Sequence, residues 1–256
     1  MFSRYVAILC VPWLCVLVLA PGARAAWDPA DGHVMHWAQT PDPAGYAAMT
    51  TAPRILADDF LCTRSGPITG IYFWGAWQGD LAGAITAVHL SIHADSAAGA
   101  VHRPGVVLWM WDGAAFDAAP VSPPSLQGWF DPMTEGYTLA DHWNQVAYGA
   151  GGFTTPFQAV KESVYWLAIQ VTATGGTWGR TTSGEAAFGS SAVWANWNPM
   201  LPVEPNWAPL TDPAVDGPLD LAFVMTPVPG TLALAALGAA GLLVRRRQRN
   251  ILQRGL

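Results

Sequence analysis

The sequence predicts an all-β protein: one jelly-roll-like β-sandwich, flanked by an N-terminal signal helix and a C-terminal membrane helix. Three observations support this fold class. The middle of the chain alternates short runs rich in Val, Ile, Tyr, Trp and Phe with Gly, Pro, Asp and Asn, as strands and turns do. No run there keeps a helical period over three turns. The 26 glycines and 21 prolines among 256 residues indicate many turns and little long helix.

Eight strands are expected, at 68–74, 84–94, 106–111, 126–130, 143–148, 164–172, 192–197 and 219–225. The run 164–169 is apolar at every position, which predicts a central strand covered on both faces. The last strand follows Pro218 and is expected to close the domain. Together these strands fit one β-sandwich domain over residues 27–226, a length that buries a substantial core.

The first 25 residues have the pattern of a secretory signal peptide. Arg4 precedes an almost wholly apolar run that ends at Ala20, and Ala23-Arg24-Ala25 forms a small-residue cleavage site. The alternative is a membrane-anchoring first helix, but the run is shorter than the ~20 residues that a span needs. The sequence therefore predicts export.

Residues 227–256 form a second terminal segment. Its apolar stretch 231–244 is followed at once by Arg245, Arg246 and Arg247. At ~1.5 Å per residue this stretch covers only about 21 Å of a hydrocarbon core ~30 Å thick, unless flanking residues extend it. The arginines would stay in the cytoplasm, with everything upstream outside. A membrane helix is expected here, and a buried core helix is the alternative.

The order of this segment resembles a PEP-CTERM sorting tail, in which a short motif precedes the membrane helix and the arginines. The motif here is Pro227-Val228-Pro229, with Val228 where the family has Glu. The resemblance implies an exosortase-type membrane enzyme as partner. It also implies a membrane-anchored precursor whose processed form reaches the cell surface or the extracellular matrix.

The segment between the two ends is strongly acidic. It holds all 18 acidic residues but only five of the 12 cationic ones, so its net charge is −13, whereas the whole chain carries −6. This charge repels nucleic acid and favours cations or neutral ligands such as polysaccharides. Charged residues make up 12% of the chain, about half the ~25% typical of soluble domains, which argues against a disordered tail or a coiled coil.

Two groups of polar residues are candidates for metal binding. Asp58, Asp59 and Asp95 could supply oxygen ligands to a structural calcium ion, although no EF-hand loop is present and acidic turn residues are the alternative. No other cofactor is expected. His89 and His93 would share one strand face about 13 Å apart, too far for one ion, and a solvated face is expected there.

Tryptophan is the most unusual feature of the composition, because 13 of the 14 copies lie in the middle segment. The pairs Trp74/Trp77 and Trp109/Trp111 could form aromatic platforms for a carbohydrate, or the same rings could fill the core. The sequence leaves both possibilities open.

No motif indicates catalysis. The chain has no nucleophile elbow and no phosphate-binding loop, and the separation of a carboxylate pair such as Asp58 and Glu135 cannot be read from sequence. We therefore expect a non-enzymatic exported protein of the cell surface or matrix. The alternative is a carbohydrate-binding module, and an extracellular polysaccharide hydrolase is the third hypothesis.

A second resemblance covers about residues 34–226. Strings such as 56–62, 73–77, 89–95, 129–132 and 220–224 are similar to a secreted domain family of unknown function found in planctomycetes and related bacteria. The resemblance implies the extent of the domain and its export, and it marks Asp58, Asp59, His93 and Asp95 as a set.

Overall fold

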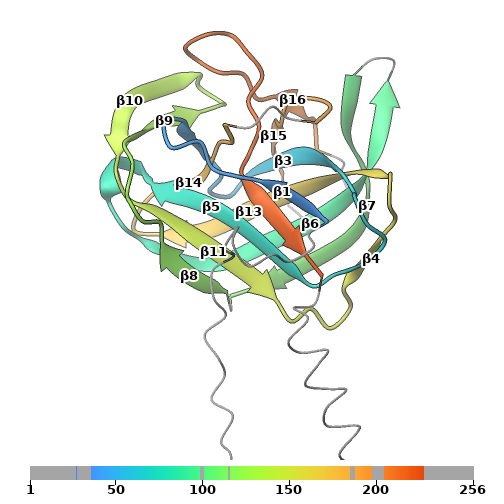
Figure 1. Cartoon of the computed structure of the whole chain (residues 1–256). Helices are drawn as coiled ribbons and strands as arrows, with labels where there is room; N and C mark the ends of the chain where they lie inside the picture. Colours follow the sequence, from blue (N-terminus) through green and yellow to red (C-terminus); the bar gives the residue numbers. More distant parts are fainter. Residues whose placement is uncertain are drawn as a thin grey trace, which may run out of the picture.

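A computed structural model describes most of the middle segment and almost none of the two ends. The described residues are 27, 36–98, 101–114, 116–184, 188–197 and 205–227. Strands dominate them, and they contain no α-helix. Two large sheets pack face to face, as Figure 1 shows, which confirms the predicted β-sandwich. The expected signal helix and membrane helix lie outside the described residues.

The larger sheet has nine strands in the order β1-β17-β5-β14-β2-β9-β10, with β11 paired to β5 and β8 paired to β11. Its strands are β1 (Trp37–Gln39), β2 (Tyr46–Met49), β5 (Gly70–Trp77), β8 (Asp117–Pro120), β9 (Gln127–Asp131), β10 (Gly136–His142), β11 (Gln145–Gly151), β14 (Trp178–Thr181) and β17 (Phe223–Thr226). All neighbours are antiparallel except β2 and β9.

The smaller sheet is antiparallel and has six strands in the order β16-β15-β3-β13-β6-β7. Its strands are β3 (Arg54–Leu61), β6 (Ala84–Ala98), β7 (Val101–Gly113), β13 (Val164–Thr174), β15 (Val193–Asn196) and β16 (Ala208–Pro209). A separate pair is formed by β4 (Gly66–Ile68) and β12 (Phe157–Ala159), and a short 3₁₀ turn, η2, spans Gln78–Asp80. The predicted central strand is confirmed, because β13 lies between β3 and β6 and is buried over most of its length.

The main core lies between the two sheets. Phe60, Ile92 and Leu167 of the smaller sheet pack toward Phe73 and Trp178 of the larger one. The Trp178 indole donates to the Tyr148 hydroxyl at 3.2 Å. Gly75 permits this packing, because a Cβ at that position would lie 2.0 Å from the Trp178 ring. Large aromatic side chains thus supply the bulk that two sheets about 10 Å apart require.

The outer face of the smaller sheet is buried as well. Ile55, Ala57 and Trp166 on this face pack against Trp207, and Trp197 adds a partly buried ring. The segment after β15 therefore covers part of the sheet as a third layer. This layer explains why the central strands are apolar on both faces.

All eight expected strands occur, with boundaries shifted by a few residues. Expectation and structure differ most at β3, whose sequence RILADDFL places two aspartates inside a strand. Asp58 and Asp59 were expected as candidate ligands or solvated turn residues, but both are buried in this strand. The strand tolerates them because each carboxylate accepts hydrogen bonds from the chain.

Candidate functional site

The buried carboxylates of β3 point to opposite faces of the smaller sheet, as successive residues of a strand do. Leu56 and Phe60, which share a face with Asp58, belong to core clusters between the two sheets. Ile55 and Ala57, which share a face with Asp59, belong to the outer cluster. The two aspartates therefore sit in separate environments.

Asp58 connects the two sheets. Its Oδ2 atom accepts from the Gln39 side-chain amide at 3.0 Å and from the Leu221 backbone N–H at 2.7 Å, and Oδ1 accepts from the Asp59 N–H at 2.9 Å. Burial raises the pKa of Asp58 well above its usual range, and the nearby Asp220 adds to the rise. The Leu221 N–H and the Arg180 charge oppose that rise.

Arg180 of β14 supplies the positive charge of this buried cluster. The side chain is fully buried, with its guanidinium carbon 5.6 Å from the centre of the Phe223 ring. One of its terminal nitrogens donates to the Leu56 carbonyl of the opposite sheet at 3.3 Å. Burial lowers the pKa of Arg180 to about 10, against the effect of Asp58, and burial raises the pKa of Asp220 to about 6. Asp58, Arg180 and Asp220 thus form one interior charge cluster between the sheets.

Asp59 belongs to a second polar group, on the outer face of the smaller sheet. Its Oδ2 atom accepts from the Ser190 N–H at 3.0 Å. Burial raises the pKa of Asp59 to about 7; the Ser190 hydrogen bond opposes the rise, and Asp220 and Asp95 add to it. Asp95 on β6 accepts from the Trp166 indole at 2.9 Å and pairs with His102 at 2.7 Å. The chain's own donors therefore engage both carboxylates.

The structure separates the three aspartates that were singled out as calcium ligands. Asp59 and Asp95 interact on the outer face, whereas Asp58 faces the interior. Within the described parts of the chain, no three His, Cys, Asp or Glu side chains are grouped in a way that could hold a metal ion.

The prediction that one face of β6 is solvated is wrong, because His89, Ser91 and His93 on that face are all buried. The rings of Trp197 and Trp207 lie against His93, with centroids 6.4 and 6.0 Å away. These side chains are buried because the third layer covers this face of the sheet. The alternation of residues along the strand does not reveal that covering layer.

Ser91 and His93 resemble part of a hydrolase site in their geometry. The Ser91 hydroxyl lies 3.0 Å from His93 Nε2, and His93 Nδ1 lies 3.0 Å from the Gly105 carbonyl. Because a carbonyl only accepts, Nδ1 carries the proton and Nε2 accepts from the hydroxyl. Both side chains are fully buried, so this pair links β6 to β7 rather than facing a substrate.

The four tryptophans proposed as platforms are turned toward protein. Trp74 is buried on the outside of β5 and contacts Trp27, whereas Trp77 packs against the main core, so this pair does not share a face. Trp109 and Trp111 do share a face, but both contact Phe153 at the edge of the core, with centroids 5.0 and 5.6 Å apart.

One aromatic residue that the sequence analysis did not single out is exposed. Trp143, between β10 and β11, is 53% exposed, and every other tryptophan that the structure describes is buried or half-buried. Its backbone N–H donates to Asp80 at 2.9 Å, and the Asn144 N–H donates to the same carboxylate at 3.0 Å. Burial alone would raise the pKa of Asp80, but these donors bring the pKa below its usual value. Its polar neighbours, His142 and Asn144, did not mark it as exposed, because Trp197 also lies between two asparagines and is half-buried.

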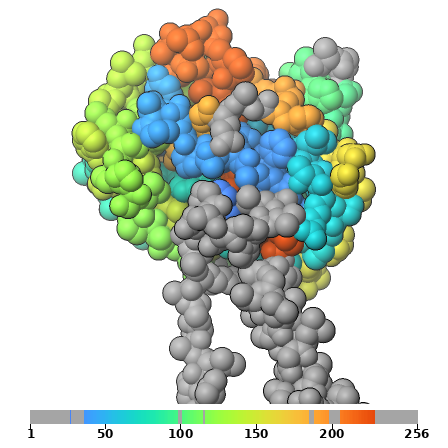
Figure 2. Space-filling view, viewed as in Figure 1, coloured from blue at the N-terminus to red at the C-terminus, as the bar shows by residue number. Residues whose placement is uncertain are grey.

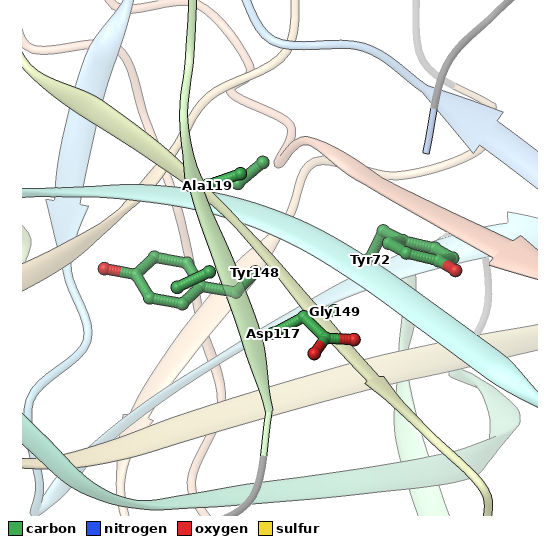
Figure 3. Close-up of a pocket in the computed structure, with 7 residues that line it drawn as sticks. Tyr72, Asp117, Ala119, Tyr148 and Gly149 are labelled. Carbon is green, nitrogen blue, oxygen red and sulfur yellow. The ribbon is translucent and has the colours of Figure 1, made fainter. Parts of the chain in front are cut away.

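The surface also has a small hollow of about 30 Å³ beside β8 and β11, which Figure 3 shows. Asp117 lies between the rings of Tyr72 and Tyr148 in that view. The hollow has room for about one water molecule. It is too small for a sugar ring or a cofactor.

Comparisons with known proteins agree with the two resemblances. The Domain of unknown function (DUF7901) matches residues 35–226. The PEP-CTERM protein-sorting motif matches residues 226–248, a range that includes Pro227, Val228, Pro229 and the arginines at 245–247. Neither curated proteins nor solved structures gave a match. Among the described residues, no helix is long and apolar enough to span a membrane, and residues 228–256 of the tail lie outside them.

Proposed function

The chain belongs to the Domain of unknown function (DUF7901) family, and we propose that it is a non-catalytic component of the cell surface or the extracellular matrix. Its PEP-CTERM motif implies export and recognition by exosortase, a membrane processing enzyme. The proposal concerns the final location of the exported protein and its role at that location.

The proposal rests on the burial of the side chains that could take part in catalysis. Asp58 and Arg180 are buried between the sheets, and Ser91 and His93 are buried beneath the third layer. Asp58, Ser91 and His93 form hydrogen bonds within the chain at 2.7–3.0 Å. One terminal nitrogen of Arg180 donates to the Leu56 carbonyl at 3.3 Å, whereas its other two nitrogens have no hydrogen-bond partner in the described part of the chain. These contacts connect neighbouring strands or sheets. Groups held in this way stabilise an extracellular domain without contacting a substrate. Such a domain suits a structural role outside the cell.

Cell fractionation tests the proposed location. In a host that carries an exosortase, we expect most of the protein at the outer surface or in the matrix. In the same host without the exosortase, we expect the protein to stay in the membrane fraction. An identical distribution in the two hosts would contradict the proposal, as would turnover of any polysaccharide in a panel by the purified protein.

Carbohydrate binding is a second candidate function, which the exposure of Trp143 favours. Tyr137 and Leu139 on the adjacent β10 are also exposed, so this edge of the larger sheet presents an aromatic and apolar surface. Figure 2 shows the segment around β9 and β10 forming one side of the molecule. An exposed aromatic ring can stack on the apolar face of a sugar while polar neighbours such as Asn144 contact its hydroxyls.

Affinity gel electrophoresis with neutral polysaccharides checks this candidate. We expect the polysaccharide to retard the Trp143→Ala variant less than the unmodified protein. The affinity should fall by at least ~10-fold, which corresponds to about 1.4 kcal/mol of binding free energy. The matched Trp143→Phe variant keeps a ring at the position and should retain most of the binding. The candidate fails if no polysaccharide in the panel retards the unmodified protein, or if Trp143→Ala binds as well as Trp143→Phe.

A further inference from the structure

Arg54, the first residue of β3, has a buried guanidinium group whose acceptors are incomplete. Its Nη1 atom pairs with the Asp131 carboxylate and donates to the Met49 sulfur at 2.8 Å. Its Nη2 atom donates to the Met133 sulfur at 3.3 Å, and the buried Nε has no hydrogen-bond partner among the residues that the structure describes. A thioether is a weak acceptor, and a buried donor without a partner is unfavourable. The edge of the guanidinium formed by Nε and Nη2 therefore lacks a strong acceptor.

The Met133 side chain lies at this edge and is open to solvent. Met133 belongs to the turn between β9 and β10 of the larger sheet and is 51% exposed. Its own N–H donates to Asp131 at 3.0 Å, which fixes the turn. Asn196, the partner of Arg54 across β15 and β3, donates to the Met133 sulfur from its side-chain amide at 3.5 Å. Two donors of the smaller sheet thus converge on one exposed sulfur.

An oxygen atom on this sulfur would be the acceptor that the guanidinium edge lacks. When hydrogen peroxide oxidises a thioether, a sulfur lone pair forms a bond to one peroxide oxygen and the O–O bond breaks. The departing hydroxide takes the proton of the transferred oxygen and leaves as water, so the sulfur is oxidised and the peroxide is reduced. The sulfoxide oxygen is polar and carries partial negative charge, so its hydrogen bonds to a guanidinium are charge-assisted.

We propose that Met133 is an oxidation site whose sulfoxide is bound by Arg54 and Asn196. The oxidant is a small peroxide, which can reach an exposed side chain. The new oxygen accepts from the Nε and Nη2 groups of Arg54, and the exposure of Met133 leaves room for its sulfur to move outward. Oxidation of a methionine normally weakens packing, but here it strengthens the contact between the β9–β10 turn and the smaller sheet. This inference does not rest on the proposed function.

Urea unfolding of the purified protein before and after treatment with hydrogen peroxide tests the proposal. Two variants form a matched pair, because Met110 is 52% exposed: Met110→Leu keeps Met133, and Met133→Leu keeps Met110. We expect oxidation to raise the urea midpoint of Met110→Leu by about 0.5 M more than that of Met133→Leu. Mass spectrometry of peptides identifies the sulfoxides. The proposal is overturned if Met133 stays unoxidised, or if oxidation changes the midpoints of both variants equally.

Further variants, made in the Met110→Leu chain, test the two donors. Arg54→Lys keeps the positive charge but has no paired N–H edge, so oxidation should no longer raise the midpoint. Circular dichroism verifies that this variant folds. Asn196→Ala changes an exposed residue, removes one donor, and should reduce the gain without affecting the fold. A gain that is unchanged in Asn196→Ala, or in a folded Arg54→Lys, would show that these residues do not bind the sulfoxide.

Discussion

Replacing Arg180 with methionine is expected to lower the free energy of unfolding by about 3–5 kcal/mol, the scale found when one partner of a buried charged group is removed. Methionine retains much of the packing volume but removes the charge that faces Asp58 and the hydrogen bond to the Leu56 carbonyl. The carboxyl groups of Asp58 and Asp220 would then share the interior without a cation. In a domain of about 200 residues this loss corresponds to a decrease of roughly 10 °C in unfolding temperature.

Urea unfolding followed by tryptophan fluorescence measures the effect. The matched control is Arg64→Met, because Arg64 is exposed and its side chain should contribute less than about 0.5 kcal/mol. A loss below about 1 kcal/mol in Arg180→Met would show that the buried charges do not hold the two sheets together.

The same variant should respond to pH in a defined direction. The pKa of Asp220 is raised to about 6 in the folded protein, so the folded state binds a proton more readily than the unfolded chain between about pH 4 and pH 6. Stability from this group therefore increases as the pH falls through 6. Arg180 opposes the rise in the pKa of Asp58, so without Arg180 that pKa rises further. Arg180→Met should therefore lose less stability at pH 5 than at pH 8.

Replacing Arg245, Arg246 and Arg247 together with glutamine is expected to lower the amount of processed protein by at least ~10-fold. By the positive-inside rule, we expect these three cations to keep the end of the apolar stretch 231–244 at the cytoplasmic side of the membrane. Without them, the stretch would lack the charge that we expect to stop its transfer and to fix its orientation toward the exosortase.

Immunoblots of membrane and extracellular fractions measure this loss. The control Arg254→Gln removes one charge but keeps the cluster at 245–247, so its processing should match that of the unmodified chain. Equal amounts of processed protein from the triple variant and the control would contradict the role given to the arginines.

Local sequence patterns predicted β13 most directly, because its environment is uniform. The run 164–169 is apolar throughout, and a short run of this kind rich in β-branched and aromatic residues is typical of a strand buried on both faces, as β13 is. Nine strands of the described structure were not expected, namely β1, β2, β3, β4, β8, β10, β12, β14 and β16. Two of them, β3 and β14, contain Asp58, Asp59 and Arg180. These charges are stable in strands only because the opposite sheet or the covering layer supplies their partners, and such partners are distant in sequence.

The candidate site differed from expectation for the same reason. The alternation in β6 correctly put His89, Ser91 and His93 on one face, but Trp207, more than 100 residues later, covers that face. For the tryptophans, sequence cannot distinguish a ring on the core face from one on the open face. Polar flanking residues do not make the distinction either, because Trp143 is exposed and Trp197 is half-buried although each lies between two polar residues.

The most direct test of the account is mass spectrometry of the C-terminal peptide of the protein outside an exosortase-bearing cell. We expect a chain that ends upstream of Arg245, because processing by the exosortase would separate the domain of residues 27–226 from the arginine cluster. A protein recovered outside the cell with an intact peptide ending at Leu256 would contradict it.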